Sequence, residues 1–157
     1  MNKKKIIYWL LVLGWAGLIF YFSAMPADTS AEQSGNIIDV VVSFLHIPES
    51  TAMVMRDLYQ FIVRKAAHFS IYLLLGIWVC LLMESYHVKK YPIWAVTTCC
   101  AYAVTDEIHQ MFVPRRACMA QDVLLDTLGA TVGVLLFYGI LRLREKRNTS
   151  GNKSTNT

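Results

Sequence analysis

Four long apolar segments constrain this chain more than any other feature of its sequence. A helix that crosses the hydrocarbon core of a bilayer, about 30 Å thick, needs about 20 residues at a rise of roughly 1.5 Å each. Four segments approach that length, at 6–22, 66–83, 91–105 and 123–141. Since 55% of the 157 residues are hydrophobic, the chain is too apolar for an ordinary soluble domain and too short for two large ones. We therefore predict a single, all-α integral membrane domain.

The first apolar segment has two interpretations, because it follows Lys3, Lys4 and Lys5. A cleaved signal peptide has a basic start, an apolar core of about 7 to 15 residues and small residues at the cleavage site. The sequence "FSAMPA" at 22–27 offers such residues. The apolar run at 6–22 is longer than a signal core, and we therefore favour a retained membrane helix.

The distribution of charge predicts the orientation of the helices. Most Lys and Arg residues lie at the N-terminus, at 89–90 and at 142–153, whereas most Asp and Glu residues lie elsewhere. Cytoplasmic loops are enriched in Lys and Arg, and an even number of spans places these three regions on one side. We therefore predict four spans with both termini in the cytoplasm. The basic residues flank apolar runs and form no separate patch, so we predict no binding of nucleic acid.

Counting about 20 residues outward from each cytoplasmic anchor gives spans of about 6–24, 64–83, 91–110 and 122–141. The outer ends of these spans carry many polar residues: Ser23, Arg64, Lys65, His68, Asp106, Glu107, His109, Gln110, Asp122 and Asp126. An unpaired charge at such depth costs from about 1 to several kcal/mol. We expect these side chains to turn toward one another, in a cluster between the helices that opens outward.

Helical spacing supports this cluster, because residues three or four positions apart share one face of a helix. Three such stripes occur: Arg64, His68 and Tyr72; Asp106, His109 and Gln110; and Asp122, Asp126, Gly129 and Gly133. Small residues four positions apart let membrane helices approach closely. The third stripe should therefore face the bundle.

The remaining segments are assigned from their patterning. Apolar residues at helical spacing in 34–45 and 50–63 predict two short amphipathic helices at the outer surface, between the first and second spans. The polar segment 148–157 is predicted to be a disordered cytoplasmic tail, which leaves 1–147 as the membrane domain.

Two blocks of the sequence resemble the signature blocks of the VanZ-like family of bacterial membrane proteins. They are "RKAAHFSIYLLLG" at 64–76 and "TDEIHQMFVPRRACMAQDVLLDTLGATVG" at 105–133, and "YFSAMP" at 21–26 is similar to a weaker first block. One departure is visible, because the family has Pro-Gly-Arg where this chain has Pro114, Arg115 and Arg116. The matching cation is Arg116. The resemblance implies a role at the cell envelope and an association with resistance to the lipoglycopeptide teicoplanin, without an established reaction. Combined with the predicted orientation, it predicts a role at the outer face of the plasma membrane.

Three hypotheses remain open for the polar residues. In an enzyme, a carboxylate or histidine would act as general base, with candidates Asp106, Glu107, His68, Asp122 and Asp126. In a binding protein, the cluster would hold a lipid-linked cell-wall precursor, another anionic envelope substrate or a lipoglycopeptide. The binding candidates in either case are Arg64, Lys65, His109, Gln110, Arg116, Tyr72 and Ser23. In the third, the charges form only an ion network that packs the helices.

The sequence favours no metal ion or cofactor. His68 and His109 with the nearby acids could complete an imidazole–carboxylate metal site, but the chain lacks a tight motif such as His-Glu-x-x-His. No Ser or Cys stands in a recognisable nucleophile motif. We expect the protein to be in contact with membrane lipids.

Overall fold

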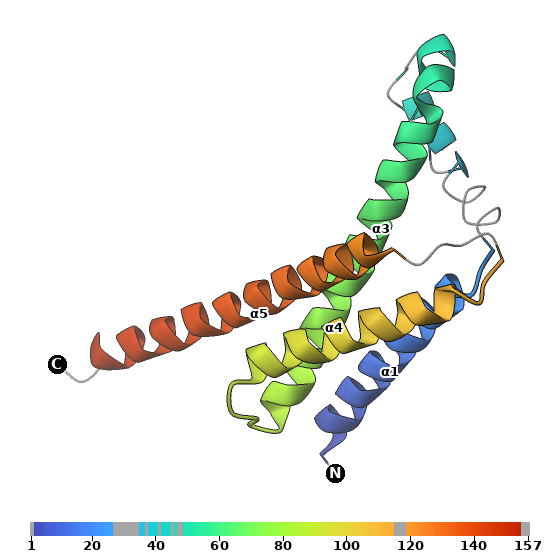
Figure 1. Cartoon of the computed structure of the whole chain (residues 1–157). Helices are drawn as coiled ribbons and strands as arrows, with labels where there is room; N and C mark the ends of the chain where they lie inside the picture. Colours follow the sequence, from blue (N-terminus) through green and yellow to red (C-terminus); the bar gives the residue numbers. More distant parts are fainter. Residues whose placement is uncertain are drawn as a thin grey trace.

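A computed structural model describes residues 2–26, 35–36, 38–40, 42–44, 46, 49–114 and 119–154. Its main helices are α1 (Lys3–Ser23), α3 (Glu49–Ser85), α4 (Tyr91–Gln110) and α5 (Ala120–Ser154) (Figure 1). Shorter helical pieces lie at 35–36, 38–40 and 42–44, and the described part of the chain contains no strand. The prediction of an all-α fold is confirmed.

Local sequence explains where these helices begin and end. The Asn2 side chain caps α1 by accepting a hydrogen bond of 3.3 Å from the Lys4 backbone N–H. The turn between α3 and α4 contains His87 and Lys90, both with positive φ. Pro92 lies in the first turn of α4, where its missing N–H removes no helical hydrogen bond.

Within the described residues, three helices are long and apolar enough to cross a membrane. They are α1, the part of α3 from Met55 to Ser85, and the part of α5 from Ala120 to Arg147. Helix α4 has 20 residues. Its last turns contain Asp106 and Glu107, which lower its hydropathy. The predicted membrane character is confirmed for three helices, and the fourth span stays a prediction.

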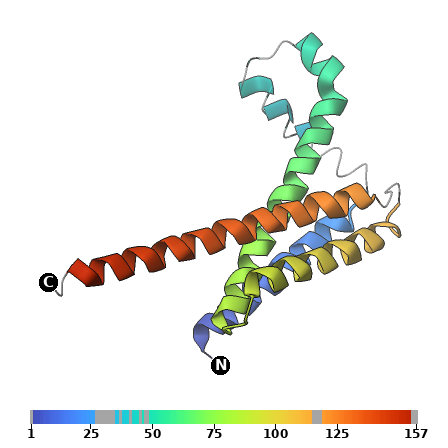
Figure 2. The same cartoon turned by 60° about the vertical axis from the view of Figure 1, so that its left-hand side comes forward.

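Helices α3 and α5 are longer than the spans predicted from the sequence. A separate external helix at 50–63 was predicted, but α3 runs through it without a break to Ser85, and its N-terminal part extends beyond the other helices (Figures 1 and 2). The reason is local, because no Gly or Pro occurs between Glu49 and Gly76. Helix α5 likewise continues to Ser154, so residues 148–154 of the tail predicted to be disordered are helical in the structure.

Glycines bring the backbones of α3 and α5 into direct contact. A Cβ atom added at each of three glycines would clash with a carbonyl oxygen on the opposite helix. The pairs are Gly76 with Ala130, Gly129 with Phe69, and Gly133 with Leu73. The predicted bundle-facing position of the Gly129 and Gly133 stripe is therefore confirmed.

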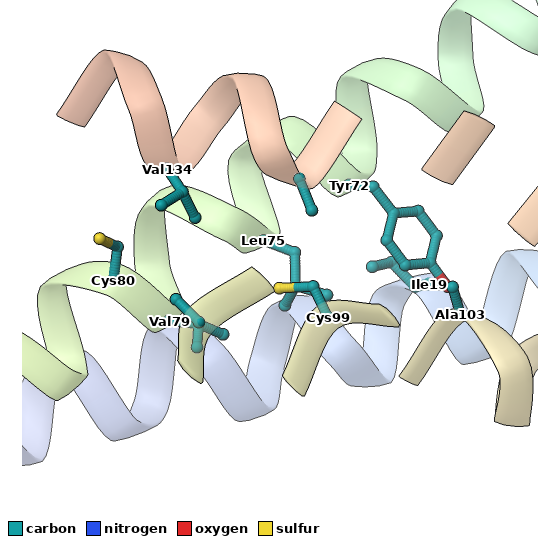
Figure 3. Packing of buried hydrophobic residues seen from close by; sticks show 10 residues of the cluster. Ile19, Tyr72, Leu75, Val79, Cys80, Cys99, Ala103 and Val134 are labelled. Carbon is teal, nitrogen blue, oxygen red and sulfur yellow. The ribbon is translucent and has the colours of Figure 1, made fainter. Parts of the chain in front are cut away.

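The apolar residues of the bundle are distributed both inside and outside. The buried cluster includes Tyr72, Leu75, Val79 and Cys99, contributed by α3 and α4 (Figure 3). Many large apolar side chains also face outward, for example Leu124 on α5, which is 64% exposed. Soluble monomers rarely expose so much contiguous apolar surface, whereas lipid contact requires it.

Three basic regions of the chain lie at one end of the bundle. The Lys5 Nζ atom lies 4.1 Å from the centroid of the Tyr86 ring, which links the start of α1 to the α3–α4 turn. The rings of Tyr91 and Tyr138, 6.2 Å apart between centroids, link the start of α4 to the C-terminal half of α5. These contacts bring Lys5, the α3–α4 turn and the turn of α5 just before Arg142 to the same end of the bundle. That the three basic regions share one side of a membrane stays a prediction.

We expect Gly133→Ala to lower the free energy of unfolding by about 1 to 3 kcal/mol, because the new Cβ would force α5 away from the Leu73 carbonyl. The measurement is reversible unfolding of the purified protein in mixed micelles. Gly139→Ala is the matched control, since a Cβ at Gly139 meets nothing within 4 Å. Equal stability of the two variants would contradict the close backbone contact.

Candidate functional site

Polar side chains from three helices gather at the end of the bundle away from the Lys5–Tyr86 contact. Here the end of α4 lies near the start of α5, the end of α1 lies beside the end of α4, and the middle of α3 crosses α5 (Figures 1 and 2). We call this group the polar cluster. Its members are Lys65, His68, Tyr72, Asp106, Glu107, Gln110, Asp122 and Asp126.

Two contacts of a basic side chain with a carboxylate join α3 to α5 within the polar cluster. The Lys65 Nζ atom contacts Asp122 Oδ1, and His68 Nδ1 lies 3.6 Å from Asp126 Oδ1. The His68–Asp126 contact directly precedes the Phe69–Gly129 contact, and the Lys65–Asp122 contact lies about one turn earlier along each helix. The close approach of the two backbones thus continues directly into the polar cluster.

Helix α4 contributes three buried polar residues. Asp106, Glu107 and Gln110 are each no more than 4% exposed. The Gln110 amide donates a hydrogen bond of 3.1 Å to Asp106 Oδ2, which uses one carboxylate oxygen. Glu107 Oε1 accepts a hydrogen bond from the backbone N–H of Met119, so this carboxylate ties the end of α4 to the segment that enters α5.

Negative charge exceeds positive charge among the described residues of this region. The carboxylates of Asp106, Asp122 and Asp126 are close enough to Glu107 to repel its negative charge. The Tyr72 side chain, fully buried, is close enough to interact electrostatically with Asp106 and Asp126. The described cations on the facing part of α3 are Arg64 and Lys65, and Lys65 is already paired with Asp122. The four carboxylates are therefore only partly neutralised by described side chains.

Several buried polar atoms here have no hydrogen-bond partner in the described part of the chain. They are Ser23 Oγ, Arg64 Nε, Tyr72 Oη, Asp106 Oδ1, His109 Nδ1 and Asp126 Oδ1. Buried polar groups in folded proteins are nearly always hydrogen-bonded, because an unsatisfied one costs about 1 to 3 kcal/mol. A network that served only to pack helices would satisfy its members.

The other residues predicted for the site have different surroundings. Arg64 is half-buried and makes no ion pair with a described acid, since its neighbour Lys65 takes that role with Asp122. The His109 ring stacks on Phe20 of α1, with 4.1 Å between the ring centroids. Ser23 is buried as the last residue of α1. Arg116 lies outside the described residues.

Sequence reasoning missed two aromatic residues that support the polar cluster. The Tyr102 hydroxyl donates a hydrogen bond of 2.6 Å to the Ala16 carbonyl, and the Tyr102 ring lies beside Tyr72. The Trp15 indole donates one of 2.9 Å to the Ile71 carbonyl. Tyr102 stands four residues before Asp106, so helical spacing could have identified it. Trp15 lies in an apolar run that offered no such signal.

The side chains of the polar cluster are of types that form hydrogen bonds and exchange protons. Within the described ranges, no three His, Cys, Asp or Glu residues are grouped as metal ligands would be. Carboxylates, a phenol and an imidazole at close range can accept, donate or transfer protons, and can hold a polar group of a ligand.

These features define a small helical protein with membrane-spanning character and a buried polar cluster near one end of its bundle. Residues 8–142 match the VanZ/LLP1 family, and the chain belongs to that family. The resemblance found in the sequence is thereby confirmed. No curated protein and no solved structure gives a match to this chain.

We expect a double-mutant cycle of Lys65→Met and Asp122→Asn to give a coupling of about 1 kcal/mol or more in unfolding free energy, because these side chains are only 23% and 21% exposed. The control cycle uses Arg56→Met and Asp39→Asn. That pair is 47% and 59% exposed, and should couple by about 0.5 kcal/mol or less. Equal couplings would contradict a special role for the Lys65–Asp122 pair.

Proposed function

We propose that this VanZ-family protein acts at the outer face of a bacterial plasma membrane. Its polar cluster binds or modifies a lipid-linked or anionic envelope substrate, and this lowers susceptibility to teicoplanin-type lipoglycopeptides. Membership of the VanZ/LLP1 family supports a role at the envelope. The alternative is a non-catalytic membrane protein whose polar cluster only packs helices.

One observation favours a functional site over a packing network. Tyr72 Oη, Asp106 Oδ1 and Asp126 Oδ1 are buried without a hydrogen-bond partner among the described residues. A buried polar atom without a hydrogen bond destabilises the fold, so an apolar side chain in its place would stabilise the protein. Such atoms are therefore retained mainly where they serve a ligand or a reaction. Ionisable residues at membrane depth support the same reading.

The proposal includes four spans with both termini in the cytoplasm. The 20 residues of α4 are enough to cross the bilayer, and the polar residues Asp106, Glu107 and Gln110 of its last turns are buried in the bundle. The contacts of Lys5 with Tyr86 and of Tyr91 with Tyr138 keep the basic regions together. With that end in the cytoplasm, the polar cluster opens toward the outer leaflet.

The chemistry of the cluster assigns roles to its residues. Arg64 and Arg116 would hold a phosphate or carboxylate of the substrate, since a guanidinium donates paired hydrogen bonds to such groups. Asp106, with one oxygen held by Gln110 and the other without a described partner, would accept a proton if a reaction follows binding. Binding and reaction thus use the same residues.

We expect reporter fusions to give the orientation proposed here. Green fluorescent protein attached after Thr157 should fluoresce, and alkaline phosphatase at the same position should be inactive, because that end lies in the cytoplasm. Alkaline phosphatase fused after Met111 should be active. The reverse pattern, or an inactive fusion after Met111, would contradict the four-span orientation.

We expect expression of the wild-type chain to raise the teicoplanin concentration needed to inhibit a sensitive host. Asp106→Asn should return it to the level of the empty vector while the protein still accumulates in the membrane, because a ligand contact is lost and the fold is kept. Glu84→Gln, at the opposite end of α3, is the matched control and should protect like wild type.

Abundance separates the two hypotheses. If Asp106→Asn lowers membrane abundance in proportion to the loss of protection, the cluster serves packing alone. Failure of the wild-type chain to protect would remove teicoplanin from the proposed function.

A further inference from the structure

The charge of the polar cluster indicates which chemical group of a ligand binds there. Asp106 is 3% exposed, and its only hydrogen bond within the described part of the chain comes from the neutral Gln110 amide. Asp126 is 2% exposed and has His68 at 3.6 Å. Asp106 has no cation at ion-pair distance among the described residues, and a buried carboxylate without one is expensive, so this part of the cluster favours a positive group.

A second observation comes from a different side chain. The Tyr72 hydroxyl is completely buried, has no hydrogen-bond partner among the described residues, and lies within electrostatic range of both Asp106 and Asp126. Figure 3 shows the Tyr72 ring beside Ile19 and Ala103, so apolar groups from α1 and α4 form the wall around this phenol. The hydroxyl is held among apolar neighbours, close to two carboxylates.

Three oxygens of these residues have no hydrogen bond within the described part of the chain: Asp106 Oδ1, Tyr72 Oη and Asp126 Oδ1, the last of which lies 3.6 Å from His68 Nδ1. Tyr72 interacts electrostatically with both carboxylates. A primary ammonium group carries one positive charge and three N–H donors, which matches three acceptors and compensates the carboxylate charge. The described residues do not group three metal-type ligands, which makes a divalent metal ion a poorer match. A quaternary ammonium has no donor to offer them.

We propose that Asp106, Asp126 and Tyr72 bind the primary ammonium group of an amine-bearing amphiphile. This inference rests on the proposed function, because it names the chemical class of the envelope molecule that the polar cluster takes. The amine lies at the carboxylates, and any phosphate or carboxylate of the same molecule lies toward Arg64, whose Nε has no described partner. The ligand is therefore zwitterionic or cationic at its polar end.

The test measures binding to the full-length protein in nanodiscs made of phosphatidylglycerol, a lipid without an amine. The probes are decylammonium, decanol and decanoate, which share one alkyl chain and differ in the head group. Wild type should bind decylammonium about 10 to 100 times more tightly than decanol, the factor expected from hydrogen bonds to a charged group. Decanoate offers only the group assigned to the arginines and should bind more weakly than decylammonium.

Two variants locate the binding. Asp106→Asn keeps the size of the side chain and should remove most of the preference for decylammonium, whereas Tyr72→Phe should reduce it by a smaller factor. Glu84→Gln removes a carboxylate at the opposite end of α3 and should leave the preference unchanged. An equal preference in wild type and Asp106→Asn would overturn the inference, as would equal binding of decylammonium and decanol by wild type.

Competition then identifies the source of the amine. Phosphatidylethanolamine, compared with phosphatidylcholine, represents a membrane lipid. A lysine peptide with blocked termini, compared with its Nε-acetylated form, represents a cell-wall precursor. Displacement of decylammonium by either amine supports the inference and names the source, and displacement by neither overturns it.

The proposed function and this inference can fail separately. Protection against teicoplanin by a wild-type protein that shows no ammonium preference would overturn the inference alone. Ammonium binding that depends on Asp106, in a protein that gives no protection, would overturn the proposed role against teicoplanin and retain the site.

Discussion

The direct contact between the backbones of α3 and α5 is the constraint on which the rest of the structure depends. Gly129 and Gly133 have no side chains to separate the two helices, so each meets a carbonyl group of α3. At that separation, Lys65 reaches Asp122 and His68 reaches Asp126 one or two turns away. Larger residues at these glycines would move the ionic partners apart and leave buried charges unpaired, so packing and electrostatics depend on the same positions.

The polar cluster is held by hydrogen bonds between the helices, and it also contains polar atoms that have no hydrogen-bond partner among the described residues. The Tyr102 and Trp15 hydrogen bonds fix α4 and α3 against α1, and the Met119 contact of Glu107 fixes the entry to α5. Among the helices held in this way, the Tyr72 hydroxyl and one oxygen of Asp106 lack described partners. Buried polar atoms without hydrogen bonds lower the stability of a protein and are typical of functional sites.

The sequence predicted the helices and the face that the glycine stripe presents, because helical period and apolar length are local properties. It did not predict that α3 continues without a break from Glu49, because the surface of a membrane is not a helix breaker and no Gly or Pro marks it. Spacing alone also grouped Arg64 with His68, whereas Lys65 pairs with Asp122. Neighbouring residues differ by about 100° around a helix, and only packing against a second helix selects between them. The stacking of His109 on Phe20 joins two distant helices and had no local signal.

Tyr72→Phe tests most directly whether the unsatisfied groups serve a ligand or the fold. This change removes one buried hydroxyl and keeps the ring. Without added ligand, the free energy of unfolding in mixed micelles should stay equal to that of wild type or rise by about 1 kcal/mol, because a buried unsatisfied group is removed. A fall of about 1 kcal/mol or more would show that the hydroxyl stabilises the bundle and does not serve a ligand.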